Sequence, residues 1–478
     1  MGTTPRAGAW VTALLAALLP AGPLLAAPRD RWTIDVSTDR QLEVLTATTC
    51  VEGKKPDRLM PMMRGARPFL LRARAVEGRR ALAIVDGSFA FPPKGACFAV
   101  DIGLGALVDE GRDRELGVRV EGALLLAPDA WLWLSRPEPD EAELRVRFHL
   151  PSGLAVATPW PESEGDFTVP RSAFDWQGMM VLGRFDRTRL SLPGTAIDLV
   201  RLGDLSADRA SLSRWAEGAA GAVSTVLGHF PDPRLLVIVE PVPGFSGDPI
   251  VFGEALRGGG SIVHALASRR AEGSSFFGEW VLVHEMSHFL LPFVAEEGTW
   301  LSEGVATYYQ NVLRARAGML SEEEAIQRLE EGFQRGRDNA VSDPMKLERA
   351  SAEMHQRGAY MRVYWTGAAI AMAADVELRV SRRGSLDAAV AATQELRRSA
   401  RERVPLLEVL RTMDGASKTE VFRRAAQAAM GNAAFPSLQD AYQKLGIRVE
   451  GGRVKLSDTP EAVALRREIF GAPQSRSR

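Results

Sequence analysis

The first third of the chain alternates apolar and polar residues over short runs. Residues 144–150 read LRVRFHL, the pattern of a strand with one buried face. Residues 32–36 and 81–85 show shorter runs of the same kind, and turn residues such as Asp86-Gly87 and Pro92-Pro93 separate the runs. This spacing predicts a β-sandwich-like N-terminal domain over residues 28–190.

The pattern changes after about residue 200. Residues 206–227 are rich in alanine, leucine and arginine and predict a helix, whereas residues 234–239 and 261–267 predict buried strands. From residue 278 onward helical patterns dominate, through residue 376 and again over residues 385–396. We therefore expect an α+β chain, with a mixed α/β lobe and a mainly helical part over residues 191–470. Residues 471–478 are expected to form a disordered tail.

The N-terminal apolar run predicts a signal peptide. Residues 9–19 follow Arg6 and are too few to span a bilayer, which takes about 20 residues. Small residues at positions 24–27 offer a cleavage site, so residues 1–27 are expected to direct export to the periplasm or the exterior. The alternative is an anchor that is retained in the membrane.

The two cysteines of the chain, Cys50 and Cys97, lie early in the part expected to be exported. An oxidising compartment favours a disulfide between them, and the alternative is two separate buried thiols.

Charge and composition narrow the functional classes. The 478 residues include 59 basic and 60 acidic side chains, which gives a net charge of −1. No global field therefore attracts nucleic acid or an anionic membrane. With 46% hydrophobic and 25% charged residues the chain has the composition of a globular protein, and its length predicts two or three domains.

Residues 284–288 read HEMSH, within an apolar stretch from Glu279 to Leu291 that lacks proline and glycine and predicts a buried helix. His284 and His288 would share one face of this helix, where two neutral imidazoles can hold Zn²⁺ and leave room for water. Glu285 could then take a proton from a water whose pKa the metal lowers. The alternative is two histidines that serve packing alone.

A third ligand is expected in the segment WLSEGVATYY at residues 300–309. Pro292 and Gly298 allow the first helix to end and a second helix to return, with Glu303 near its start. Thr307 would lie one turn later on the same face, where it could support a ligand by a hydrogen bond.

HEMSH followed by WLSEGVATYY resembles the gluzincin metallopeptidases. The chain is most similar to the glycyl-aminopeptidase-like family and more distantly to the aminopeptidase N family. This resemblance implies a thermolysin-like catalytic lobe, one zinc ion held by His284, His288 and Glu303, Glu285 as the general base, and peptide or protein substrates.

Residues 364–367 read YWTG, where the family typically has Tyr-x-Lys-Gly. By this resemblance Tyr364 donates a hydrogen bond to the oxyanion, and Tyr360, one helical turn earlier, is the alternative. Thr366 replaces the lysine of the family. Both tyrosines could instead be core aromatic residues.

Aminopeptidases of this group carry a glycine-rich strand whose glutamate binds the free amine of the substrate. The corresponding residues here are expected to be Gly260 to His264, with Val263 at the position of that glutamate. Gly260 could still pair with peptide backbone, and His264 could line the cleft. Because valine cannot pair with an ammonium group, aminopeptidase activity is in doubt. Three other glutamates could bind the amine in place of the family's glutamate: Glu254, Glu296 and Glu297.

The leading hypothesis is therefore an exported zinc-dependent peptidase, with exopeptidase or endopeptidase action left open. A non-catalytic peptide-binding or chaperone-like protein on a peptidase scaffold is the alternative, and a zinc hydrolase with a different substrate is a third reading. A binding protein would not need the base Glu285, which favours catalysis.

Overall fold

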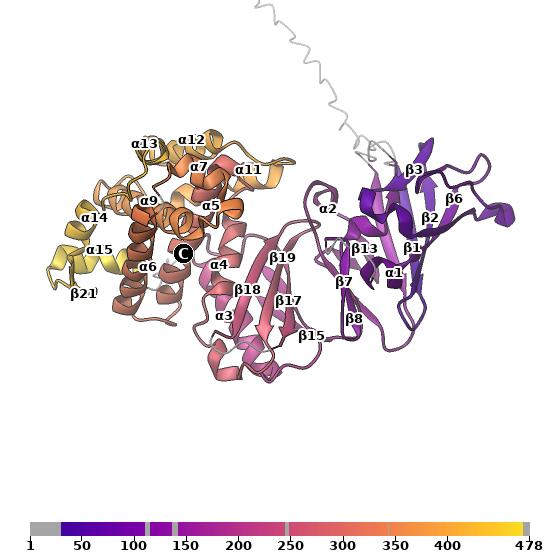
Figure 1. Cartoon of the computed structure of the whole chain (residues 1–478), viewed down its shortest axis with the longest axis horizontal. Helices are drawn as coiled ribbons and strands as arrows, with labels where there is room; N and C mark the ends of the chain where they lie inside the picture. The colour runs from indigo at the N-terminus through magenta and orange to yellow at the C-terminus, as the bar shows by residue number, and fades with distance from the viewer. Residues whose placement is uncertain (1–29, 110–114, 136–141, 244–247, 343, 472–478) are drawn as a thin grey trace, which may run out of the picture.

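The computed structural model describes residues 30–109, 115–135, 142–243, 248–342 and 344–471. The chain runs from a strand-rich N-terminal part, through a central sheet, to a C-terminal part made almost entirely of helices (Figure 1). The expected signal peptide, residues 1–27, and residues 472–478 of the expected tail lie outside the described residues. Among those that are described, no helix has both the length and the apolar character needed to span a membrane.

Two sheets form most of the N-terminal part. The first is seven-stranded, in the order β12-β13-β10-β1-β2-β6-β4, and the second is four-stranded, in the order β11-β14-β8-β7. Trp32 and Phe98 of the first sheet and Leu124 of the second belong to one buried hydrophobic cluster. The strands of the first sheet are β1 (Arg31–Thr38), β2 (Val44–Glu52), β4 (Leu70–Ala75), β6 (Cys97–Gly103), β10 (Glu143–His149), β12 (Glu162–Ser163) and β13 (Asp166–Thr168), and those of the second are β7 (Gly117–Val120), β8 (Ala123–Leu126), β11 (Ala155–Ala157) and β14 (Met180–Gly183).

Two of the three strands predicted in this part are confirmed. Residues 32–36 lie in β1 and residues 144–150 correspond to β10, and the two strands pair in parallel with Ile34 opposite Val146. The strand predicted over residues 81–85 is wrong. That run makes only isolated bridges at its two ends, and Val85 is 60% exposed beside the turn at Asp86-Gly87, so no buried face supports a strand.

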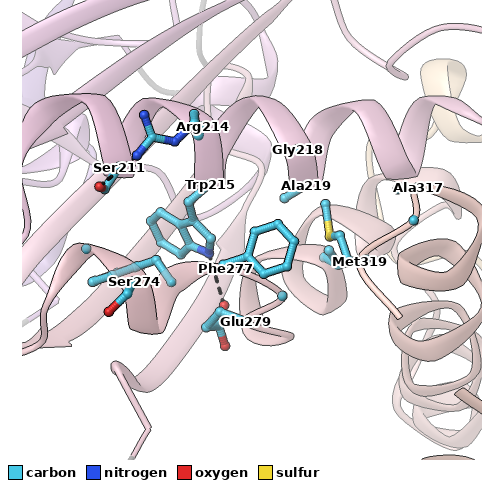
Figure 2. Close-up of a pocket in the computed structure, with 15 residues that line it drawn as sticks. Ser211, Arg214, Trp215, Gly218, Ala219, Ser274, Phe277, Glu279, Ala317 and Met319 are labelled. Atoms are coloured by element: carbon cyan, nitrogen blue, oxygen red, sulfur yellow. Dashed lines mark hydrogen bonds between the residues drawn. The ribbon is translucent and has the colours of Figure 1, made fainter. Parts of the chain in front are cut away.

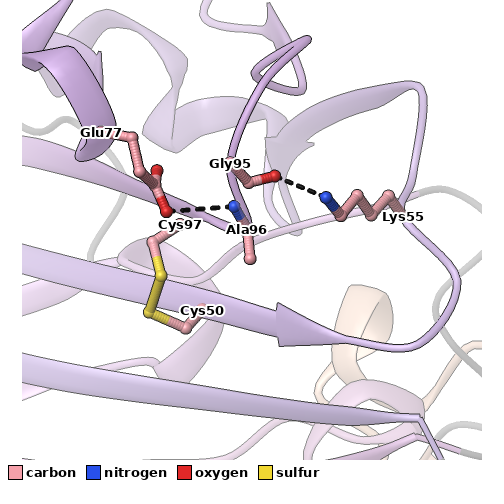
Figure 3. The surroundings of a disulfide bond; sticks show 6 residues. All are labelled: Cys50, Lys55, Glu77, Gly95, Ala96 and Cys97. Carbon is pink, nitrogen blue, oxygen red and sulfur yellow. Dashed lines mark hydrogen bonds between the residues drawn. A yellow bond between two sulfur atoms is a disulfide. The ribbon is translucent and has the colours of Figure 1, made fainter.

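The predicted disulfide between Cys50 and Cys97 is confirmed. Cys50 on β2 lies directly opposite Cys97 on β6, with Cα atoms 4.1 Å apart (Figure 3). Beside it the Glu77 carboxylate accepts a hydrogen bond from the backbone N–H of Ala96 at 3.1 Å. The bond therefore joins two neighbouring strands of the N-terminal part.

The central sheet has five strands in the order β15-β16-β17-β19-β18, with β18 antiparallel at one edge. One face, which includes Val237 and Val263, packs against helices, and the other, which includes Leu236, shares a cluster with Leu125 and Val181 of the N-terminal part. The strands predicted over residues 234–239 and 261–267 are confirmed. The bounds are β15 (Asp186–Leu192), β16 (Thr195–Arg201), β17 (Arg234–Val242), β18 (Ile250–Leu256) and β19 (Ser261–Ser268). The hairpin of β15 and β16 straddles residue 190, the expected end of the N-terminal domain.

The helix that carries the HEMSH segment is shorter than the sequence predicts. It spans α4 (Val281–Ser287), and the chain then tightens into the 3₁₀ helix η5 (His288–Leu290). The buried carboxylate of Glu279 precedes α4 and accepts hydrogen bonds from the backbone N–H groups of Val281 at 2.6 Å and Leu282 at 3.2 Å. The indole of Trp215 donates to the same carboxylate at 3.2 Å (Figure 2). Glu279 precedes the N-cap residue Trp280 and satisfies two of the free N–H groups at the start of the helix.

Helices α1 and α2 belong to the N-terminal part, and the other helices cover the central sheet and build the C-terminal part. The predicted helix over residues 206–227 is confirmed as α3 (Arg209–Ser224), whereas the one predicted over residues 385–396 divides at Thr393 into α10 and α11. The remaining bounds are α1 (Leu104–Asp109), α2 (Ser172–Asp175), α5 (Thr299–Arg316), α6 (Glu322–Ser342), α7 (Leu347–Ala352), α8 (Met354–Arg357), α9 (Tyr360–Val380), α10 (Leu386–Ala392), α11 (Gln394–Ser399), α12 (Leu406–Ser417), α13 (Val421–Met430), α14 (Gln439–Leu445) and α15 (Pro460–Phe470).

Helices α5 and α9 cross with their backbones in close contact. The crossing lies at Gly304 and Gly367, and a Cβ atom placed on Gly367 would be 2.0 Å from the carbonyl oxygen of Trp300. A Cβ atom placed on Gly304 would be 2.3 Å from the backbone of Gly367. Only glycine fits at this distance, so both positions are fixed by packing.

We expect Gly367→Ala to lower the free energy of unfolding by about 1–3 kcal/mol, because the added methyl group forces the two helices apart. Urea unfolding of the full chain measures this change. Gly221→Ala is a matched control, since Gly221 lies in α3 with open space around its Cα. That substitution should leave stability unchanged or raise it by up to about 1 kcal/mol. Equal stability of the two variants would contradict the proposed crossing.

Candidate metal centre and active site

Three potential metal ligands converge between α4 and α5. His284 lies on α4, His288 directly follows it, and Glu303 lies in the second turn of α5. One ligand atom from each residue lies within 4.8 Å of the other two. The Oε2 atom of Glu303 is 3.3 Å from Nε2 of His284 and 3.6 Å from Nε2 of His288. The structure therefore brings together the three residues that the sequence predicts as ligands.

Neighbouring side chains orient both imidazole rings. Nδ1 of His284 lies 2.9 Å from Oε1 of Gln310, and Nδ1 of His288 lies 3.2 Å from the hydroxyl of Ser302. With a metal bound, a proton on each Nδ1 would leave the lone pair of each Nε2 for the metal. The support expected from Thr307 is not made, since its buried hydroxyl has no hydrogen-bond partner among the described residues.

Burial and neighbouring charges set the protonation of the ligands. Burial lowers the pKa of His288 to about 4, so its ring is neutral. Burial would raise the pKa of Glu303, but His288, His284 and the hydroxyl of Tyr364 outweigh this effect and lower it. An ionised carboxylate beside a neutral imidazole is a donor set suited to Zn²⁺.

Glu285 lies beside this cluster and is 9% exposed. Burial, assisted by the negative charges of Glu303 and Glu254, raises the pKa of Glu285 to about 7. The strand β18 approaches it closely, since a Cβ atom on Gly253 would lie 2.9 Å from Cγ of Glu285. A carboxylate with a pKa near neutrality can both accept and return a proton, as a general base must.

The cluster opens into a cavity of about 980 Å³. Its walls come from β18 and the residue after it, from α4, from the start of α5, and from the region of α8 and α9. His284, Glu285, His288 and Glu303 all line it. The cavity therefore has room for several residues of a peptide next to the metal ligands.

Both candidate tyrosines line this cavity, but they differ in environment. The ring of Tyr364 stacks on His284 with centroids 5.7 Å apart and planes 16° apart. Burial, together with Glu303 and Glu285, raises the pKa of Tyr364, so its hydroxyl keeps its proton. Tyr360 is 38% exposed, and its hydroxyl lies 3.3 Å from Nδ1 of His355. The geometry favours Tyr364 as the donor nearest the ligands.

The structure places Val263 away from the cavity, which corrects the expectation that it faces the substrate. Val263 is fully buried in β19, an inner strand, where it packs with the helices on that face of the sheet. Gly260 lies in the turn before β19. Neither residue lines the cavity, because β18 lies between β19 and the edge of the sheet.

The strand beside the metal ligands is β18, and it carries Glu254 into the cavity wall. Glu254 lies opposite His264 of β19, and its Oε1 atom is 3.0 Å from Nδ1 of His264. His264 itself does not line the cavity. The other glutamates considered from the sequence, Glu296 and Glu297, lie outside the cavity lining as well.

Arg257 and His355 also line the cavity, and sequence reasoning did not identify them. The Arg257 guanidinium lies over the rings of Phe289 and Phe293 and donates a hydrogen bond to the carbonyl of His288. No motif marks either residue, since each reaches the site through the packing of distant segments.

Comparison with known families agrees with these features. Residues 293–373 match the family model of the M61 glycyl aminopeptidases. This segment includes Glu303 and Tyr364 but begins after His288. No curated protein sequence matches the chain.

The chain is also similar in fold to solved metallopeptidase structures. An aminopeptidase N family protein from Idiomarina loihiensis aligns over 88% of this chain and 79% of its own, with a TM-score of 0.66 and 14% identity. An M1 zinc metallopeptidase from Deinococcus radiodurans aligns over 86% of this chain and 95% of its own, with a TM-score of 0.52 and 17% identity. A variant of the Deinococcus protein bound to a Tyr-Ser-Ala substrate aligns over the same shares, with a TM-score of 0.51 and 17% identity.

The family match supports a peptidase function in general, and the solved structures support the fold. They also agree with the resemblance that the HEMSH and WLSEGVATYY segments indicate. The chain thus combines a segment that matches the M61 glycyl aminopeptidase model with a mixed α/β fold similar to that of the M1 zinc metallopeptidases.

Proposed function

We propose that the chain is a zinc-dependent metallopeptidase that hydrolyses peptide bonds. The observation that carries the proposal is the convergence of His284, His288 and Glu303 beside the buried carboxylate of Glu285, in one cavity. The donor set fits zinc, since two imidazole Nε2 atoms and one carboxylate oxygen face a common point. When bound, zinc would supply Lewis acidity to the scissile carbonyl and to the attacking water.

The side chains around this point have the properties that peptide hydrolysis needs. Glu285 would take the proton of the attacking water and return it to the leaving amine, and its raised pKa suits both steps. The protonated hydroxyl of Tyr364 would donate a hydrogen bond to the oxygen that becomes negative as water adds. Glu285 and Glu303 are buried, so little water screens the electrostatic interactions of their carboxylates.

Glu254 supports an aminopeptidase rather than an endopeptidase. It lies on the strand that borders the cavity, within reach of the electrostatic field of Glu285. A carboxylate at this place can hold the α-ammonium group of a peptide while the first peptide bond lies at the metal ligands. Val263 does not border the cavity, so its apolar side chain does not bear on the binding of an amine there.

We further infer that residues 191–470 form a thermolysin-like catalytic lobe behind a β-sandwich-like domain, and that residues 1–27 direct export to the periplasm or the exterior. The disulfide between Cys50 and Cys97 supports the inference of an oxidising compartment.

The metal ligands can be tested without any substrate. The purified chain should bind about one zinc ion, and Glu303→Gln should weaken zinc affinity roughly a hundredfold or more, since it removes the charged ligand. Titration against a fluorescent zinc chelator measures both values. Glu296→Gln is the control, because Glu296 is exposed and lies outside the cavity lining. Equal zinc affinity of the two variants would remove Glu303 from the ligand set.

Glu285→Gln should keep zinc but lower kcat by about two to four orders of magnitude, because the amide cannot accept the proton. Steady-state hydrolysis of a short peptide, with zinc content measured on the same sample, separates the two effects. Hydrolysis by the variant at the rate of the wild type would rule out Glu285 as the base.

Glu254→Gln should raise KM for a peptide with a free amine by roughly ten- to a hundredfold, since a charge-assisted hydrogen bond is lost. The same peptide with an acetylated amine should be a poor substrate of both proteins. Efficient cleavage of the acetylated peptide by the wild type would show an endopeptidase instead.

A further inference from the structure

Three ionisable side chains form a line across neighbouring strands of the central sheet. Glu240 lies on β17, His264 on β19 and Glu254 on β18. Nε2 of His264 is 2.9 Å from Oε2 of Glu240, and Nδ1 is 3.0 Å from Oε1 of Glu254. Of the three, only Glu254 lines the cavity. The line lies on the face of the sheet opposite α4, because Gly253 faces α4 and the next residue points the other way, and it reaches the cavity at the edge strand.

The three side chains of this line together carry one net negative charge. Burial alone would lower the pKa of His264, but hydrogen bonds to Glu240 and Glu254 raise it to about 9. At neutral pH the ring is an imidazolium that donates from both nitrogens. Two carboxylates and one imidazolium sum to a single negative charge, and a substrate ammonium group would neutralise it.

Glu254 needs a fixed partner because of its place in the sheet. Its side chain is 34% exposed and lies on the edge strand, where a flexible glutamate would otherwise sample several rotamers. The imidazolium binds Oε1 alone, and Oε2 accepts no hydrogen bond from any described residue. One oxygen is therefore held and the other is left for a ligand.

Glu240 has a matching role on the inner side. Its side chain is 14% exposed, and it binds the nitrogen of His264 that faces away from Glu254. This contact sets the ring orientation and keeps the second proton on the imidazole, in the way that a carboxylate orients a histidine in many active sites.

We propose that His264, oriented by Glu240, is a positioning residue that fixes the Glu254 carboxylate for the α-ammonium group of the substrate. This inference rests on the proposed peptidase function and deepens it. It predicts that recognition of the amine depends on two residues that do not touch the substrate.

The test compares trialanine with propionyl-dialanine, which is the same peptide without its amine. The quantity measured is the ratio of kcat/KM for the two peptides, using the zinc-loaded full chain. His264→Leu removes both donors, whereas His264→Gln keeps an amide that can still donate to Glu254. Zinc content and melting temperature are measured on every variant.

We expect His264→Leu to reduce the preference for trialanine by roughly tenfold or more, mainly through KM, and His264→Gln to recover part of it. Glu240→Gln should show a smaller loss in the same direction. His149→Gln is the matched control, since His149 also pairs with a carboxylate, Asp35 at 2.7 Å, but on the N-terminal sheet. It should keep the full preference.

A purely structural role would give a different result. If the folded His264 variants lower kcat/KM by the same factor for both peptides, the preference is unchanged and the positioning role is overturned. If Glu254→Gln also leaves the preference unchanged, the amine is bound elsewhere and the inference fails with it.

Failure of the proposed peptidase function can be distinguished from failure of the positioning role. If the zinc-loaded wild type hydrolyses neither peptide, calorimetric binding of the two peptides replaces the kinetic ratio. A preference for trialanine that His264→Leu abolishes would still support the positioning role, and a preference that survives in this variant would overturn it.

Discussion

The backbone contact between α5 and α9 is the constraint on which the site depends. At Gly304 and Gly367 the two helices approach more closely than any side chain allows. Glu303 is the neighbour of the first glycine, and Tyr364 lies one helical turn before the second. The absence of two methyl groups therefore sets the separation between a candidate metal ligand and the proposed oxyanion donor. Because interiors are close-packed, a change at this crossing would move both groups at once.

A second close approach closes the opposite side of the site. Gly253 of β18 lies against Glu285 of α4, so the cavity is bounded by one glycine contact on the side of the strand and another on the side of the helices. Burial makes the ring of His288 neutral and holds the pKa of Glu285 near neutrality, so the packing of the fold determines the chemistry of these side chains.

Local sequence patterns predicted those features that depend only on residues close together in the sequence. The spacing of His284 and His288 and the alternation in β10 are of this kind, and both describe the structure well. Patterns could not predict which strand forms the sheet edge, since this depends on how distant segments pair. The resemblance to the family's glycine-rich strand therefore placed Val263 at the cavity, although the strand of Val263 is internal. The packing role of Gly367 could not be predicted either, because the residue it contacts, Gly304, lies on another helix.

Strand β18 pairs with β19 along one side, and its other side is the edge of the sheet beside the metal ligands. The unpaired N–H and C=O groups of such an edge match the backbone of an extended chain and no other conformation. A peptide bound there would add a sixth strand to the sheet. Under the proposed function, pairing at this edge would favour extended chain ends: flexible or unfolded termini could adopt the required shape, whereas a terminus held within a folded domain could not.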